Sequence, residues 1–368
     1  MFFKEIPGSG PVKELMQRAG NEKKVPHASL LIGPSGRGGL PIVRALMALI
    51  LCKQPVNGDS CGTCSNCQKT HHLNHPDIHW TFPTIGSKAR SADVGQSWRA
   101  LMLEHPYASL SDWQNKIEAE NKQFNMNVLE VQDIIDFAGM KSYQGEEKFL
   151  VIWMADFLGQ DGNRLLKMIE EPPDGMYIFL LARHREAIIN TILSRCRLMV
   201  LDPFSDSDIQ SFLEENHQLD SKRATSLAFQ ANGDLNLAIR ALSQSEDASF
   251  QDFVGWMRIC YLGRPADIVQ HSDEFSKLGR ESQKHLIQVG LNTLQAILTH
   301  QYLGAGALRL PVDHQKPIRN LAKLLDIRQM NEVVEWLQKA GQGLQQNAHP
   351  KILYTHISHQ IHLVFHNH

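Results

Sequence analysis

Four closely spaced cysteines carry the most specific chemistry in the sequence. Cys52, Cys61, Cys64 and Cys67 follow the pattern C-x8-C-x2-C-x2-C. Four thiolates are the donor set of a tetrahedral structural zinc site. Turn residues between the first two cysteines, including Asn57-Gly58, let the chain fold back on itself. We therefore predict one Zn²⁺ in a knuckle over residues 52–67, in preference to free thiols or a disulfide pair.

Histidines close to this cluster are candidate competing ligands. They are His71, His72, His75 and His79. Because four cysteines already complete a tetrahedral site, we interpret these histidines as surface residues or as neighbours of the ligands. A catalytic zinc is disfavoured for the same reason, since four sulfur ligands leave no open position.

A glycine-rich stretch has the outline of a phosphate-binding loop. Gly33 and Gly38 stand at the spacing of G-x-x-x-x-G-K-[ST], between an apolar strand (28–32) and a helix (41–49). Gly39 stands where the phosphate-binding lysine belongs, and Leu40 where the magnesium-binding hydroxyl belongs. The loop can offer backbone N–H groups at a helix N-terminus, but it is degenerate and we expect no bound cofactor there.

The acidic pair that holds Mg²⁺ in nucleotide hydrolases is also missing. Such a pair ends a buried strand, and the strand at 148–153 ends in Trp153 and Met154. Asp156 comes two residues too late, and we expect it to cap the next turn. Both halves of the nucleotide chemistry are therefore lost.

The elements that position these residues predict an α/β domain followed by helices. Apolar strands at 28–32, 78–82, 148–153, 176–181 and 197–201 alternate with helices, which is typical of a parallel sheet covered on both faces. Residues 84–125 form an insertion without assignable chemistry. Beyond Pro203 the pattern is helical only, with a three-helix unit at 204–244, a polar linker at 243–247 and six further helices to residue 365.

Composition adds limits on partners and location. The chain has 368 residues, a net charge of −2 and no long apolar run, so we expect no membrane span, no global basic field and a cytoplasmic protein. Histidines gather near the end, at positions 356, 359, 362, 366 and 368. Their spacing by three drifts around a helix, and we interpret them as the edge of a packed helix.

The order of these motifs resembles the clamp-loader branch of the AAA+ family. The resemblance rests on Pro26-His27-Ala28, the loop 33–40, the cysteine knuckle, Ala155-Asp156, the segment 163–173 with its Glu170-Glu171-Pro172-Pro173 end, and Thr191-Ile192-Leu193-Ser194-Arg195-Cys196. It covers roughly residues 20 to 200.

That resemblance implies a three-part chain. Its parts are an AAA+ type domain (1–203), a helical lid (204–244) and a helical collar for oligomerisation (245–368). The implied partners are motor ATPase subunits and a delta-type subunit in a ring of five, with the sliding clamp and primer-template DNA reached through the complex. The assembly would have DNA-directed DNA polymerase activity, but this subunit would have no ATPase of its own. The nucleotide-sensing arginine of the lid aligns with Asn236, one turn before Arg240.

Arg195 is the catalytic candidate that the resemblance implies. In the family this arginine projects into the nucleotide site of the neighbouring subunit, and a guanidinium presents fixed, charged donors to phosphate oxygens. We interpret Ser194 and Cys196 as residues that position the turn rather than as nucleophiles. Two alternatives stay open: a motor-type ATPase in which Lys23, Lys24 or Arg37 replaces the missing lysine, and a zinc-knuckle nucleic-acid adaptor outside replication.

Overall fold

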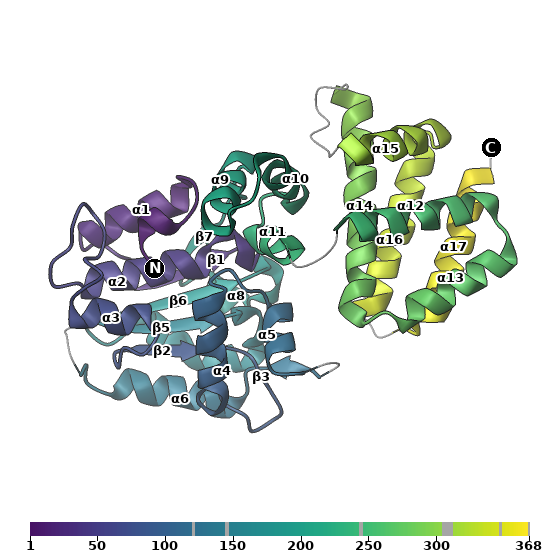
Figure 1. Cartoon of the computed structure of the whole chain (residues 1–368). Helices are drawn as coiled ribbons and strands as arrows, with labels where there is room; N and C mark the ends of the chain where they lie inside the picture. Colours follow the sequence, from purple (N-terminus) through teal and green to yellow (C-terminus); the bar gives the residue numbers. More distant parts are fainter. Residues whose placement is uncertain (120–121, 144–146, 243–245, 304–311, 346–347, 367–368) are drawn as a thin grey trace. The chain divides into compact units, whose positions relative to one another are not determined.

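A computed structural model describes residues 1–119, 122–143, 147–242, 246–303, 312–345 and 348–366. Its contacts divide the chain into two compact units (Figure 1). One comprises Met1–Gln218 with Ala231–Ile239, and the other Leu219–Gln230 with Arg240–His368. The expected lid at 204–244 is thus shared between two units, and the three-part division stays a prediction. The polar linker expected at 243–247 falls partly outside the described residues, and α12 already begins at Glu246.

The first unit is built on a five-stranded parallel sheet. Its strand order is β2-β5-β6-β1-β7, and every adjacent pair is parallel. The strands are β1 (Ala28–Ile32), β2 (Ile78–Thr81), β5 (Lys148–Trp153), β6 (Met176–Ala182) and β7 (Arg197–Val200). The predicted parallel sheet is confirmed, and each strand agrees with its predicted range to within one residue.

Side chains along these strands point alternately to the two faces of the sheet, and both faces are covered by helices. Leu31, Val151 and Phe179 point into one core, which also contains residues of α2 (Gly39–Leu51). Leu30 and Ile152 point into the other core, with residues of α6 (Val128–Gly139). Because successive side chains of a strand face opposite sides, the uninterrupted apolar runs bury both faces (Figure 1). Further helices of the first face are α1 (Pro11–Asn21) and α3 (Ser65–His71).

The insertion contains more than the short helices that we expected. Its helices α4 (Ser91–Glu104) and α5 (Leu110–Lys116) bury Trp98 and Trp113. A small antiparallel pair, β3 (Thr84–Ile85) and β4 (Phe124–Asn125), joins the first residues of the insertion to its last ones. The two-residue strands were missed because nothing in their sequence alternates over enough residues to indicate a strand.

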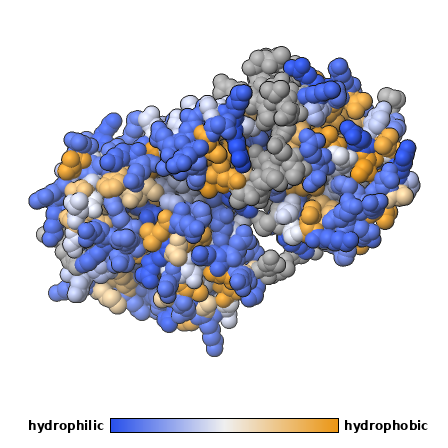
Figure 2. Space-filling model, viewed as in Figure 1, coloured by the Kyte–Doolittle hydropathy of each residue, from blue (hydrophilic) through white to orange (hydrophobic). Residues whose placement is uncertain are grey.

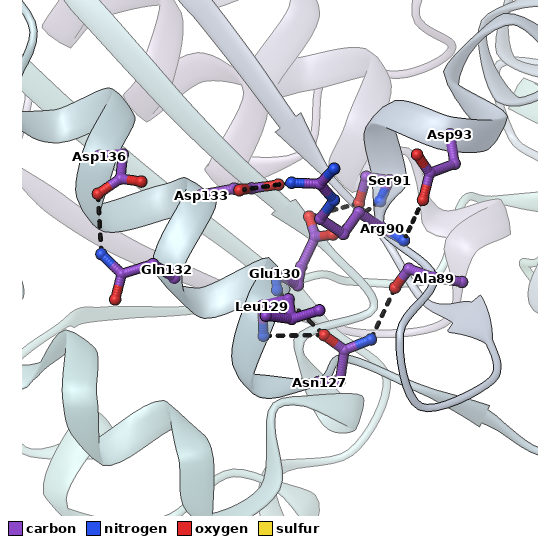
Figure 3. A network of polar contacts seen from close by, with 10 residues as sticks. All are labelled: Ala89, Arg90, Ser91, Asp93, Asn127, Leu129, Glu130, Gln132, Asp133 and Asp136. Carbon is purple, nitrogen blue, oxygen red and sulfur yellow. Dashed lines mark hydrogen bonds and ion pairs between the residues drawn. The ribbon is translucent and has the colours of Figure 1, made fainter.

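A polar network fastens the insertion to α6 (Figure 3). The buried Glu130 carboxylate accepts hydrogen bonds from the backbone N–H of Ser91 at 2.7 Å and from its hydroxyl at 2.5 Å. Asn127 caps α6 and donates to the carbonyl of Ala89. Burial raises the pKa of Glu130. The insertion is therefore a packed part of the first unit.

Helices make up the rest of the chain. After β7 come α9 (Asp206–His217), α10 (Ser221–Ala231) and α11 (Leu235–Leu242). The second unit continues with α12 (Glu246–Leu262), α13 (Pro265–Lys277), α14 (Arg280–Leu303), α15 (Val312–Leu324), α16 (Ile327–Gln345) and α17 (Pro350–His366). In its core the Tyr354 ring stacks between Trp256 and Phe275, with centroids 4.3 and 4.1 Å away.

The surface is mainly hydrophilic in the view of Figure 2, where hydrophobic residues are scattered over both units. Among the described helices, none is long and apolar enough to cross a membrane.

Candidate functional site at the carboxyl edge of the sheet

The glycine loop lies at the carboxyl edge of the sheet, beyond β1. The N–H of Gly33 donates to the carbonyl of Ala182 at the end of β6, at 2.9 Å. Ser35–Arg37 form a short 3-10 turn, and Gly38 adopts a left-handed conformation (φ +83°) as the N-cap of α2. In open α/β sheets this edge is where ligands bind, so the loop is placed where a phosphate-binding loop should be.

The positions of the missing nucleotide ligands are filled with apolar groups. Leu40 is buried in the first turn of α2, and Trp153 and Met154 are buried after β5. The Trp153 ring meets that of Trp98 of the insertion in an edge contact with centroids 6.1 Å apart. Leu40, Trp153 and Met154 line a cavity of about 20 Å³ beside the loop, which is room for about one water molecule.

Arg183 is the one charged residue among the described residues that line this cavity. Its Nε lies 3.6 Å from the carboxylate of Asp156, which also accepts hydrogen bonds from the backbone N–H groups of Arg183 and His184. Asp156 therefore ties the end of β5 to the end of β6. Asp156 does not cap the next turn: it lies inside the 3-10 turn Ala155–Phe157, and the following turn has Leu158 as its N-cap with no side-chain hydrogen bond. The expectation for Asp156 was wrong because its carboxylate instead accepts from two N–H groups that follow β6.

The loop also makes a close contact with α11 that the sequence did not indicate. A Cβ atom on Gly36 would lie 1.6 Å from Oδ1 of Asp234 and 2.7 Å from the backbone nitrogen of Asn236. The Asp234 side chain accepts from the N–H groups of Asn236 and Leu237 and so caps this helix. Asn236, the aligned sensor position, is buried and donates to Asp112 of α5.

Arg195 lies after α8 (Asn190–Leu193), on a short turn before β7. Its guanidinium forms an ion pair with Glu170 at the end of α7 (Leu166–Glu170). It also donates to the carbonyl of Thr191 at 2.9 Å and to the hydroxyl of Ser194 at 3.2 Å. Both charged side chains are partly exposed. The segment that leads to Glu170 is a 3-10 helix (Gly159–Leu165) that continues into α7.

Residues around Arg195 have structural roles. Thr191 donates to Asn163, which joins the two sequence motifs a second time. Burial raises the pKa of the Cys196 thiol to about 11, so it is protonated at neutral pH and a poor nucleophile. Ser194 supports the turn by donating to the carbonyl of Thr191.

The four cysteines of the knuckle converge on one point. Their sulfur atoms all lie within 4.8 Å of one another, and those of Cys61 and Cys67 are 3.8 Å apart. Zn–S bonds of about 2.3 Å in a tetrahedron require sulfur atoms about 3.8 Å apart. Cys52 is the C-cap of α2, and Cys64 is the N-cap of α3. Between Cys52 and Cys61 the chain reverses direction in a turn at Val56–Asp59.

Backbone N–H groups are directed at the sulfur atoms. Cys61 donates to Sγ of Cys52 at 3.2 Å, and Cys64 donates to Sγ of Cys61 at 3.4 Å. The N–H of Cys64 is the main cause that lowers the pKa of Cys61 to about 6, whereas burial raises that of Cys67. The cluster can hold a metal ion, and its donor set fits zinc.

The neighbouring histidines lie outside this cluster. The His71 ring packs edge-on against Phe2, the buried His75 accepts from the N–H of Asp77, and the His79 ring stacks on Phe137. Burial lowers the pKa of His71 and of His79 to about 4. His71 and His79 therefore pack as neutral rings. The interpretation as surface residues holds for the exposed His72 and was wrong for the buried His75.

Comparisons with known proteins bear on the same part of the chain. Residues 8–205 match the protein family described as DNA polymerase III, delta subunit. DNA polymerase III subunit delta' of Escherichia coli (strain K12) is 28% identical over 180 residues, which are 48% of this chain and 42% of the relative. Subunit delta' of Bacillus subtilis (strain 168) is 24% identical over 205 residues, 55% of this chain and 50% of the relative. The chain thus spans about half the length of the curated relatives it matches.

One solved structure aligns with most of the chain. The DNA polymerase III gamma subunit-related protein of Thermotoga maritima aligns with 95% of this chain and 99% of its own, with 16% identity and a TM-score of 0.39.

Proposed function

This chain belongs to the DNA polymerase III delta-subunit family and is of its delta-prime kind, and we propose that it hydrolyses no ATP itself. We propose that it instead completes the ATP site of a neighbouring subunit. The observation that carries the proposal is the filled site at the carboxyl edge. Leu40, Trp153 and Met154 occupy the ligand positions, and the remaining cavity is about 20 Å³. No lysine or carboxylate of the described residues lines it.

Arg195 is the residue through which we propose that the chain acts. A guanidinium donates two parallel hydrogen bonds to phosphate oxygens and stays charged at all relevant pH values. An arginine finger supplied in trans accelerates nucleotide hydrolysis by about 10³–10⁵. Arg195 lies on a turn at the surface of the first unit, and its hydrogen bonds to Thr191 and Ser194 hold the guanidinium in place.

A ring-shaped complex with other subunits is part of this proposal. We propose that motor ATPase subunits and a delta-type subunit join this chain in a ring of five through the helices of residues 245–368. The ring would open the sliding clamp and place it on primer-template DNA. Nucleic-acid contact would use phosphates without reading bases. The four cysteines would hold a structural Zn²⁺ that stabilises the first unit.

The test measures ATP hydrolysis in the reconstituted complex. Arg195→Ala is expected to leave assembly intact and to slow ATP hydrolysis at the neighbouring subunit's site by about 10³–10⁵. The ATPase rate of the whole complex should therefore fall by the fraction that this one site contributes. Arg197→Ala is the matched control, because Arg197 is an exposed arginine two residues away. A normal rate with Arg195→Ala refutes the role in trans. Hydrolysis by the isolated chain, abolished by Arg37→Ala, would instead support the motor-type alternative.

A further inference from the structure

The last helix of the second unit presents three histidines on one face. His359, His362 and His366 follow each other at intervals of three and four residues on α17, which brings them to the same side of a helix. The rings of His362 and His366 have centroids 4.4 Å apart, and those of His359 and His362 are 6.4 Å apart. His359 and His366 are exposed and His362 is partly buried.

The hydrogen bonds of two of these rings fix which nitrogen is free. Nδ1 of His362 lies 2.9 Å from the carbonyl oxygen of Cys260, and Nδ1 of His366 lies 3.0 Å from that of His362. A carbonyl oxygen only accepts, so each Nδ1 must donate. In the neutral rings the lone pair is therefore on Nε2 of both histidines.

This hydrogen bonding is the kind that metal-binding histidines have, although among the described residues only the cysteine cluster already brings three or more ligand atoms within 4.8 Å of one another. A ligating imidazole characteristically donates its other N–H to a carboxylate, a backbone carbonyl or water, which fixes the tautomer and the ring orientation. Here both carbonyl partners belong to the protein backbone. Gly263, with φ +63°, makes room for the ring of His362, since a Cβ atom there would lie 2.1 Å from its Cε1. The backbone after α12 thus holds the first ligand in place.

We propose that His362 and His366, joined by His359 after a change of its rotamer, form a second metal site for a borderline divalent transition ion. Imidazole nitrogen suits Zn²⁺, Ni²⁺ and Cu²⁺, whereas Mg²⁺ and Ca²⁺ require oxygen ligands. Metal–nitrogen bonds of about 2.0–2.1 Å are compatible with neighbouring rings at 4.4 Å. Exposed side chains change rotamer within nanoseconds, so His359 can complete the site on binding. Three imidazoles leave a position open to water.

The test uses the full chain with its cysteine site already filled with Zn²⁺. Titration with Ni²⁺ by calorimetry is expected to show one further ion per chain. Paramagnetic Ni²⁺ should broaden the NMR ring signals of His359, His362 and His366 and spare that of His349, which precedes the first turn of the same helix. His366→Gln should abolish this second equivalent, and His359→Gln should weaken it by at least about tenfold.

His356→Gln is the matched control. His356 is an exposed histidine of the same helix whose ring contacts Trp336 instead, so its substitution should leave Ni²⁺ binding unchanged. Because His359 and His366 are exposed, their variants should keep the helical content and zinc content of the unsubstituted chain. The absence of a second Ni²⁺, its persistence in His366→Gln, or an equal loss in His356→Gln would overturn the proposal.

Discussion

The carboxylate of Glu170 forms an ion pair with the guanidinium of Arg195, which lies 25 residues later in the sequence. The carboxylate is at the last residue of α7, and the guanidinium follows α8. Glu170 thereby contacts the one arginine that we propose to act on a neighbour's nucleotide. In the assembled state phosphate oxygens would have to replace this carboxylate as the partner of Arg195, or share the guanidinium with it.

Glu170→Gln tests whether this ion pair positions Arg195. An ion pair between partly exposed side chains is worth at most about 1 kcal/mol, so we expect hydrolysis in the reconstituted complex to slow by no more than about fivefold. The contacts with Thr191 and Ser194 would remain. Glu171→Gln, at the neighbouring exposed glutamate, is the control and should change nothing. A loss as large as that of Arg195→Ala would mean that Glu170 takes part in the reaction itself.

Cysteine substitution tests the knuckle. Metal analysis of the purified chain should find one zinc in the cysteine cluster, and Cys64→Ser should lose it. Because metal binding to four thiolates is coupled to folding, the free energy of unfolding should fall by more than about 3 kcal/mol. Cys196→Ser removes a thiol outside the cluster and should leave the zinc in place. A metal-free chain that melts at the unchanged temperature would contradict the knuckle.

Gly36→Ala tests the contact between the glycine loop and α11. The added methyl group would overlap Asp234 and approach the backbone of Asn236, so we expect a destabilisation of about 1–3 kcal/mol in denaturant unfolding. Gly95→Ala is the control. Its methyl group would meet no atom within 4 Å, and alanine is preferred over glycine in a helix such as α4 by about 1 kcal/mol. Equal stability of both variants would show that α11 moves away from the loop at little cost.

The buried His79 predicts a pH dependence of stability. Its pKa falls from 6.5 to about 4 on folding because burial disfavours the charged ring. The folded state therefore excludes a proton that the unfolded chain binds below pH 6.5, and stability is lost as the pH falls from about 6.5 towards 4. Between pH 7 and pH 5 this single group should account for about 2 kcal/mol.

His79→Phe isolates that contribution. The new ring can stack on Phe137 as the imidazole does, and it removes an Nε2 atom that is buried without a hydrogen-bond partner. We expect stability at pH 7 to be equal or higher and its decrease towards pH 5 to be smaller by about 2 kcal/mol. The measurement is denaturant unfolding of both proteins at the two pH values. An unchanged pH profile would mean that His79 is accessible to protons in the folded state.

Several features were predictable because they depend on local sequence. Apolar runs of five or six residues separated by helical patterns specified the strands and their parallel arrangement. The absence of lysine at Gly39 and of carboxylates at Trp153 and Met154 required only a comparison of residue types with their chemical tasks. The four cysteines were predictable because a donor set is defined by its residues, and their spacing allows them to meet.

Other features depend on segments distant in the sequence and required the fold. Asp156 was expected to cap the next turn, but parallel pairing of β5 and β6 brings to it two N–H groups that follow β6. The histidines of α17 were interpreted from their spacing as an edge of a packed helix. Only the tertiary structure shows that the carbonyl of Cys260, in another helix, fixes the tautomer of His362.

The sequence by itself determined which residue types stand in the glycine loop, at the end of β5 and in the cysteine cluster, because these follow from the identity of the side chains. The tertiary structure decided which of those groups meet. Arg195 with Glu170, Gly36 with Asp234 and the ring of His362 with the carbonyl of Cys260 are set by how the elements pack, since hydrogen bonds and ion pairs act only over a few ångströms. Composition and spacing place residues along the chain, and packing brings distant ones within that range.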